Sequence, residues 1–384
     1  MPHCYCATRK LPLDMLPAKQ RPLTAKALEQ HEARERKTSE SRGKKAEAVV
    51  DGARRQLHDL LGSKNLSALR SAMRQENTAL RDLREPPGGL SLDFDKANKA
   101  RKKKIDSLVK KFGFNPQQVR DIGRSTGDKL REVLGTPAGT VTPGFNLAQN
   151  LSKWTDLSPL HKFPLDWGVR PPLDVTDPNQ WQIFGPEFPF WNQAFDGVES
   201  DSFVVRRECL QDERFGFVAN WVTMICTDAD NFDFASGLAD TEVVFIYEAP
   251  TSGRLEVIID ASNAAGKHDL RIENEFGFSS HQTDQSNYLS LNVFHPNVSE
   301  RSLSLMSHFR ATGVDDRTYS EASLTPGAHY YGHMVSNGTV AGGDTFFVGV
   351  GTRTFDITSA DDVAVNSSSD FQWLIRSVEV RIVP

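Results

Sequence analysis

The sequence predicts a mainly β protein. Its C-terminal half is expected to be an antiparallel, jelly-roll-like β-sandwich, preceded by a basic helical region and an extended strap rich in proline and aromatic residues. Three observations predict this: apolar residues alternate with a period of two from about residue 201, helical spacing is confined to the front, and charge divides between the halves. Residues 1–150 hold 30 Lys and Arg against 17 Asp and Glu, whereas residues 151–384 hold 15 against 33. The two halves must therefore meet different physical demands.

Composition excludes several classes of protein. The chain has 384 residues, of which 38% are hydrophobic and 25% charged, as is ordinary for a folded globular protein. The sequence has no run of 18 apolar residues, so we expect no membrane insertion. The N-terminus lacks the apolar core of a classical signal peptide, which predicts a cytoplasmic or particle-associated protein. Four cysteines are too few for a disulfide framework.

The composition shifts along the chain predict four regions. Residues 1–45 are expected to be a leader that is largely disordered or forms a solvated helix. Residues 46–135 form the basic helical region, and 136–200 form the strap, which is too aromatic for a flexible linker. Residues 201–384 form the β-sandwich domain, which is large enough to fold alone.

A helical hairpin is predicted within the basic helical region. Two stripes of mostly apolar residues recur at spacings of three and four, as expected for amphipathic helices, and the residues 62–65 between them break the pattern. Pro and Gly at 85–89 end the second helix. The stripes are Ala46, Val50, Ala53, Leu57 and Leu60, then Leu66, Leu69, Met73, Glu76, Leu80 and Leu83.

A third helix is predicted over 94–112, and it is strongly basic. Its cations would bind an acidic protein surface, including the acidic half of this chain, or alternatively nucleic acid by neutralising phosphates. Further along, 119–134 resembles a helix-hairpin-helix DNA-binding element, although the tight turn between its two glycines is missing. We predict two short helices there, over 117–122 and 126–134. The candidate binding residues are Lys99, Arg101, Lys102, Lys103, Lys104, Lys110 and Lys111.

Nine or ten half-buried strands are predicted in the sandwich, because large apolar residues alternate with smaller or polar ones between turn-forming clusters. Near the C-terminus the alternation is interrupted. A β-bulge near Arg376 would place Trp373 and Ile375 on the core side. The clearest alternating segments are Phe215–Ile225, Val243–Tyr247, Leu255–Ile259, Leu289–Val293, Leu303–Phe309, Phe346–Val350 and Val378–Ile382.

Two groups of side chains suggest metal binding. His329 and His333 are four residues apart on a predicted strand, so they share one face with Tyr331 between them. Asp228, Asp230 and Asp233 concentrate carboxylates in a loop after a strand, and oxygen-rich loops suit calcium. The alternative for each group is a polar surface. We expect no cofactor other than calcium at this loop.

The sequence contains none of the common catalytic or nucleotide-binding motifs, including G-x-S-x-G, H-E-x-x-H and the P-loop. We therefore expect a non-enzymatic structural or recognition protein, which self-associates or docks into a larger particle through its basic front. A coat, fibre or cargo component fits, and a basic arm before a jelly roll resembles the layout of icosahedral RNA-virus coats. The alternative is a carbohydrate-binding or carbohydrate-active sandwich.

Overall fold

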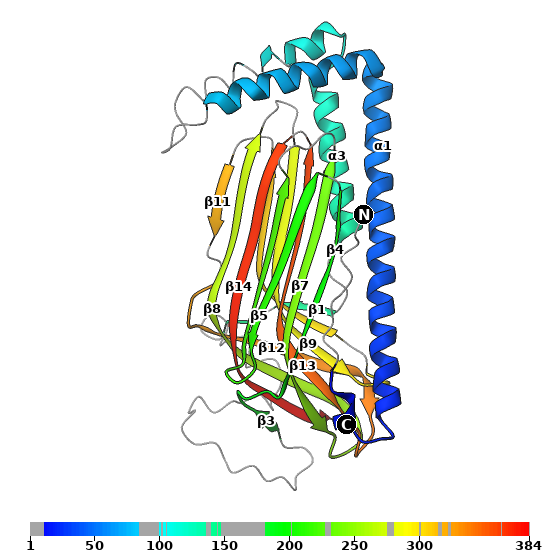
Figure 1. The fold of residues 1–384 in the computed structure, drawn as a ribbon, viewed down its shortest axis with the longest axis vertical. Coiled ribbons are helices and arrows are strands. Elements are labelled where there is room, and N and C mark those ends of the chain that lie inside the picture. The colour runs from blue at the N-terminus through cyan, green and yellow to red at the C-terminus, as the bar shows by residue number, and fades with distance from the viewer. Residues whose placement is uncertain are drawn as a thin grey trace.

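Three layers make up the part of the chain that the computed structural model describes (Figure 1). Two β-sheets face each other, and two helices cover the outer face of one sheet. The described residues are 11–83, 100, 103–104, 106–135, 140–143, 145–146, 181–200, 202–226, 232–274, 280–298, 301–313, 317–321, 324–361 and 363–383.

The first sheet, sheet A, has six strands in the order β1-β10-β9-β13-β7-β4. Its neighbouring strands are antiparallel except that β1 runs parallel to β10. In that order the strands are Thr140–Pro143, Arg301–Gly313, Ser280–Phe294, Thr345–Asp361, Asp233–Glu248 and Phe190–Glu199.

The second sheet, sheet B, has eight strands, and all its pairings are antiparallel. The main order is β2-β12-β8-β14-β6-β5, with β11 beside β8 and β3 beside β14. Its strands are β2 Phe145–Asn146, β12 His329–Val340, β8 Gly253–Asn274, β14 Val363–Val383, β6 Phe217–Cys226, β5 Phe203–Asp212, β11 Arg317–Glu321 and β3 Gln182–Phe184.

These sheets confirm the predicted antiparallel sandwich. Most successive strands from β6 onward cross from one sheet to the other, so partners such as β8 and β14 are distant in sequence. The longest strand has 22 residues, which at the usual rise is about 70 Å. Ladders of this length make the sandwich an elongated, stiff body.

Strand β13 shows how one strand serves several environments. Phe346, Val348 and Val350 point between the sheets into the largest apolar core. Further along the same face, Thr352–Thr358 places buried polar side chains between the sheets. The opposite face points towards the helices and includes Phe355.

The predicted bulge in β14 is also confirmed. The pairing register of β14 with β8 shifts between Ile375 and Ser377, and Trp373 and Ile375 are both fully buried.

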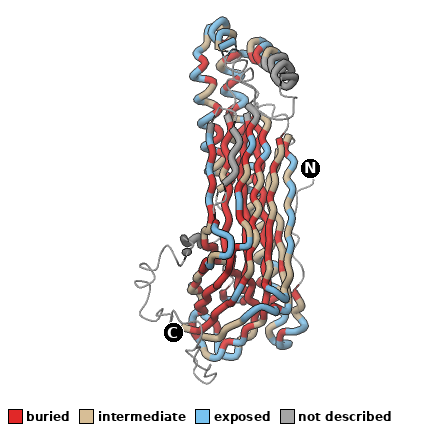
Figure 2. The backbone as a smooth tube through the Cα atoms, turned by 90° about the vertical axis from the view of Figure 1, so that its left-hand side faces the viewer, coloured by how far each residue is buried: buried red, intermediate tan, exposed pale blue. Residues whose placement is uncertain are grey.

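The long helix α1, Arg21–Leu83, corrects two expectations about the front. It begins well inside the predicted leader, where a helix was one alternative, but this helix is not fully solvated, because its buried face continues towards the N-terminus through Thr24 and Ala27. The chain does break at Gly62, as the spacing predicted, but it bends there instead of forming a hairpin (Figure 1). Along α1 buried positions alternate with exposed ones, whereas in the strands of the two sheets most positions are buried (Figure 2). A short 3-10 helix, η1 at Leu13–Met15, precedes it.

Helix α3, Pro116–Leu134, is one continuous helix and not the two short helices that were predicted. It begins as expected, with the Asn115 side chain accepting from the backbone N–H of Gln117 at 3.0 Å. Gly127 lies inside the helix because the backbone packs against Gln282 of β9, where a Cβ would come within 2.7 Å of that side chain. The glycine therefore permits close packing and does not break the helix, so the resemblance to a helix-hairpin-helix element is not realised.

The strap contributes strands to both sheets. Its described parts form β1, β2, β3 and β4, and β4 completes one edge of sheet A. The first long strand of the sandwich therefore begins at Phe190, earlier than the predicted start at 201. Residues 147–180 of the strap lie outside the described residues. Whether the four regions fold as separate units stays a prediction.

Replacing Gly62 should destabilise the bend in α1. Its backbone has φ 73° and ψ 154°, a conformation essentially reserved for glycine. No heavy atom lies within 4 Å of a Cβ built there, so the cost of Gly62→Ala is backbone strain, about 1–3 kcal/mol. The matched control is Gly52→Ala, which has equal space and should stabilise α1 by about 0.5–1 kcal/mol. Thermal unfolding measures both, and a stabilised Gly62→Ala variant would contradict the bend.

Candidate functional site

The basic segment is defined as residues 99–111, and its described residues lie beside α1 close to the bend. Lys99, Arg101 and Lys102 fall outside the described residues. Its helical residues 106–111 turn Val109 into the apolar cluster that also contains Leu57 and Leu61 of α1. The four described lysines face outward and are exposed: Lys103, Lys104, Lys110 and Lys111.

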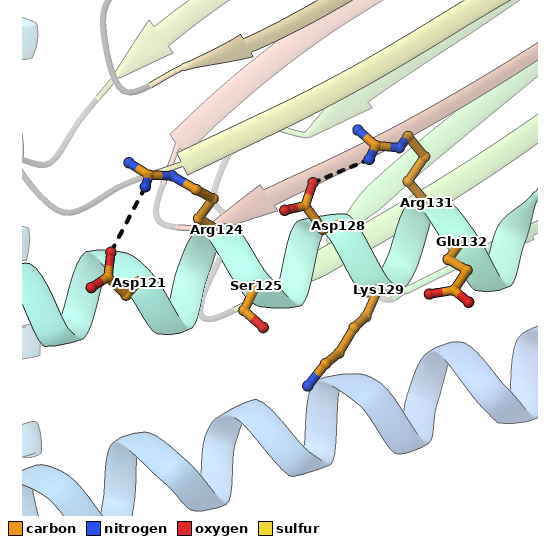
Figure 3. Close-up of a pocket in the computed structure, with 7 residues that line it drawn as sticks. All are labelled: Asp121, Arg124, Ser125, Asp128, Lys129, Arg131 and Glu132. Carbon is orange, nitrogen blue, oxygen red and sulfur yellow. Dashed lines mark hydrogen bonds and ion pairs between the residues drawn. The ribbon is translucent and has the colours of Figure 1, made fainter.

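The outer side of α3 is the second charged surface of the helical layer. It borders a shallow hollow of about 540 Å³, whose lining side chains are drawn in Figure 3. Within α3, Asp121 pairs with Arg124 at 3.8 Å and Asp128 with Arg131 at 3.2 Å. These cations are matched by acids one helical turn away, which is typical of a solvated helix face. The basic segment is therefore the stronger candidate for an acidic ligand.

His329 and His333 share the outer face of sheet B, as their spacing predicted. Each meets its own carboxylate on the neighbouring strand β8: His329 Nδ1 lies 2.9 Å from Asp260, and His333 Nε2 lies 2.9 Å from Glu256. Between the two pairs, Tyr331 is buried against Ile258. Within the described residues no three His, Cys, Asp or Glu side chains form a metal-holding group, so metal binding here stays a prediction.

Arg381 extends this row on β14. Its Nε donates to Glu256 at 2.6 Å, and its guanidinium lies 4.4 Å from the ring centre of Trp181. Burial alone would raise the pKa of Glu256, but hydrogen bonds from His333 and Arg381 together hold that pKa below its usual value. The arrangement is an ion-paired strip on the outer face of sheet B, and it joins the neighbouring strands β12, β8 and β14.

The predicted calcium loop is only partly described. Asp228 and Asp230 lie outside the described residues. Asp233 is the first residue of β7 and is 4% exposed, so its carboxylate is held within the fold and not on an open loop. Calcium binding at this loop therefore stays a prediction.

A buried ionic cluster, which the sequence reasoning missed, joins α1 to sheet A. Arg353 of β13 is 1% exposed, and its Nε and Nη2 donate to Asp240 of β7 at 3.0 and 2.7 Å. Arg301 of β10 hydrogen-bonds Glu35 of α1. His31, one turn before Glu35, lies 3.1 Å from the same guanidinium. The helix is thus fixed to the sheet by charges as well as by apolar contacts.

Protonation within this cluster follows from its burial and its arginines. Burial opposes ionisation of Glu35, but Arg301 and Arg353 outweigh it and lower its pKa to about 2. Burial raises the pKa of Glu242 to about 8, with the adjacent Asp240 adding to the rise. Burial also lowers the pKa of His31 to about 4. At neutral pH, His31 and Glu242 are therefore mostly neutral while Glu35 is charged.

A polar network lies between the two sheets. His268 of β8 is fully buried, with Nε2 2.8 Å from Ser307 and Nδ1 3.0 Å from Ser369. Ser369 in turn donates to Asp356 at 2.9 Å, and Gln285 donates to the other carboxylate oxygen at 3.3 Å. Burial lowers the pKa of His268 to about 3 and raises that of Asp356 to about 8.

A Ser–His–Ser–Asp chain suggests catalysis at first sight, but its geometry favours a structural role. All of its members lie on strands that face the closed interior, and each of them is buried. A nucleophile must reach its substrate, whereas these side chains satisfy one another's hydrogen bonds. The network therefore aligns the two sheets.

Comparisons with known proteins reveal only slight similarity. No family model and no curated protein matches the chain. Among solved structures, the enzymatically active domain of bacteriophage CBA120 tailspike protein 4 is 9% identical, with a TM-score of 0.13; the match covers 45% of this chain and 19% of that one. A CBM4 structure is 11% identical, covering 50% and 90%, with a TM-score of 0.10. The infectious bursal disease virus Gx strain structure is 10% identical, covering 53% and 77%, with a TM-score of 0.08.

These similarities are too slight to support a function. At this level of similarity, nothing about the tailspike, the carbohydrate-binding module or the virus is carried over to this chain. Among the described helices, none is both long enough and apolar enough to cross a membrane.

The buried titratable groups predict how stability depends on pH. Asp356 and Glu242 keep their protons in the fold up to about pH 8 and release them near their ordinary pKa values when unfolded. Stability therefore falls as the pH rises through this window, by up to about 1.4 kcal/mol per unit for each group. His31 and His268 instead weaken the fold as the pH falls below about 6.5. Between about pH 4.5 and 6.5 the effects of the two acids and the two histidines oppose each other. We therefore expect the free energy of unfolding to be nearly constant in this range and lower on either side.

Asp356→Asn tests the source of the alkaline decline. An amide cannot ionise, so denaturant unfolding between about pH 6.5 and 8 should show roughly half the wild-type slope, because Glu242 still titrates. An unchanged slope would show that Asp356 ionises normally in the fold.

Proposed function

We propose that this chain is a non-enzymatic assembly protein, in which the sandwich is a rigid displayed body and the basic segment docks onto an acidic partner. The observation on which this rests is the position of the lysines. They project from a short helix whose other side is anchored in the α1–α3 cluster. A charged surface held on a fixed support loses less entropy on binding than a flexible tail would.

The charge distribution favours an acidic protein surface as the partner. Residues 151–384 of this chain hold 33 acidic residues against 15 basic ones, so another copy offers such a surface. Lysines bind acidic surfaces as point charges and need no fixed planar geometry. Nucleic acid is the other ligand class with the required charge, and it is an outcome of the test below.

Removing four lysines together tests the proposal in the full chain. The variant changes Lys103, Lys104, Lys110 and Lys111 to Gln. The control makes the same change at four exposed lysines of α1, away from the basic segment: Lys26, Lys37, Lys44 and Lys45. Polyglutamate is titrated at about 0.05 and 0.5 M salt, where screening lengths differ several-fold. We expect wild type and control to bind at low salt only, and the variant to bind at least tenfold more weakly.

A short nucleic-acid duplex is titrated in parallel. Stronger binding to the duplex, with a steep salt dependence and loss of copurifying nucleic acid in the variant, would assign the basic segment to nucleic acid instead. If the variant matches wild type in both titrations, the segment is a solvated face and the proposal fails.

A sugar-binding face is the second candidate, and Trp221 favours it. This half-buried ring lies on the outer face of sheet B, in register with Glu208 of β5 and Asp370 of β14. An indole beside carboxylates can stack on a sugar ring while its neighbours accept from hydroxyl groups. Affinity electrophoresis in soluble polysaccharide should then show retardation that Trp221→Ala abolishes and the control Phe215→Ala, in the adjacent turn, keeps. Equal migration with and without polysaccharide would exclude it.

A further inference from the structure

Strand β5 is an edge strand with an unusual exposed face. It pairs with β6 along its whole length, and within the described residues no strand lies on its other side. Its residues alternate between exposed and half-buried, and Val204 and Leu210 are 54% and 53% exposed. Edge strands leave a row of backbone N–H and C=O groups available for pairing, and natural proteins usually shield them. β5 has no proline and no lysine, and its charged residues Arg206, Arg207 and Glu208 include both signs.

We propose that β5 pairs antiparallel with β5 of a second copy of this chain, joining two B sheets into one continuous sheet. The two-fold axis would pass through Arg207. In that register Arg206 lies opposite Glu208 of the other copy, and by symmetry Glu208 lies opposite Arg206. Val204 and Leu210 then also face each other across the same pair of strands. Cross-strand pairs of opposite charge and of apolar residues are those that stabilise antiparallel sheets.

Charge selects this register over its neighbours. Directly opposed residues in an antiparallel pair must lie on the same face of the sheet, so the axis can shift only by whole residues. Moving it to Arg206 would place Arg206 against itself, and moving it to Glu208 would place Glu208 against itself. Both shifts bring like charges together, which destabilises the pair. Of these three registers, only the axis through Arg207 makes the exposed face of β5 complementary to itself.

Arg207 itself would meet its own copy at the axis, but its charged end is held away. Its side chain points to the inner face of the strand, and Nη2 lies 3.5 Å from the Ser236 carbonyl oxygen of β7 in the facing sheet. Gly197 of β4 leaves room for the guanidinium, because any Cβ there would clash with it. The two guanidinium groups would therefore extend into separate sandwiches.

This pairing goes beyond the proposed function and does not depend on it, because the basic segment is on the helical layer and β5 is in sheet B. The experiment is a charge exchange in the full chain. Arg206→Glu places two carboxylates opposite each other in each cross-strand pair, and Glu208→Arg places two guanidinium groups opposite each other. The double variant Arg206→Glu with Glu208→Arg restores both opposite-charge pairs in reversed order. The control is Arg254→Glu, which makes the same charge change at an exposed position on β8.

Sedimentation equilibrium over a range of concentrations measures the dissociation constant, and circular dichroism confirms that each variant is folded. We expect a concentration-dependent dimer for wild type and control, at least tenfold weaker association for each single variant, and recovery in the double variant. The inference would be overturned if the wild type stays monomeric over a roughly 100-fold range of concentration, or if the single variants associate as strongly as wild type. Dimers that are lost only when the four lysines are changed would also overturn it, and would place self-association on the basic segment.

Discussion

The position of α1 on sheet A depends on the buried ionic cluster. Arg301 and Arg353 occupy the outer face of the sheet with almost no exposure, and each would be unstable there without a carboxylate partner. Asp240 pairs with Arg353 within the sheet, whereas Glu35 comes from the helix, so the pair of Arg301 with Glu35 is complete only when the helix is docked. Removing one partner from such a cluster typically costs about 3–5 kcal/mol. The cluster therefore fixes the helix in one register, which apolar packing alone specifies poorly.

The strands could be predicted from the sequence, whereas the docking of α1 could not. Alternation reports half-burial directly, so segments such as Phe346–Val350 and the bulge near Arg376 were identified from residue pattern alone. In the N-terminal half of α1, Thr24 is buried and His31 and Glu35 are half-buried, whereas a hydrophobicity pattern treats such residues as solvated. The missed signal was their spacing, which continues the Ala46–Leu57 stripe backwards by steps of three and four. That spacing indicates a buried face only when the arginines that contact it, which come from two distant strands, are known.

The candidate sites were predictable to a smaller extent. The pattern correctly placed His329 and His333 on one face, but their partners Asp260 and Glu256 come from a strand 69 and 77 residues earlier, and no local spacing indicates that pairing. The polar interior was also missed. Thr352–Thr358 alternates like an exposed face, because sequence polarity does not distinguish water from a buried network in which His268 and Asp356 satisfy each other through Ser369. Similarly, the importance of Arg206 and Glu208 depends on β5 being an edge, which is a property of the topology.

The layering determines which surfaces are open to partners. Sheet A is covered on its outer face by α1 and α3, and its β4 edge adjoins α1, where Val198 lies against Gly43. Sheet B has no such helical cover in the described part of the chain, and its β5 edge is open. The proposed contacts of the sandwich would therefore use sheet B, and the proposed charge-driven contacts would use the basic segment on the helical layer. Because these two surfaces belong to opposite layers, one copy can pair through β5 and still present its lysines, which is the arrangement that an extended assembly requires.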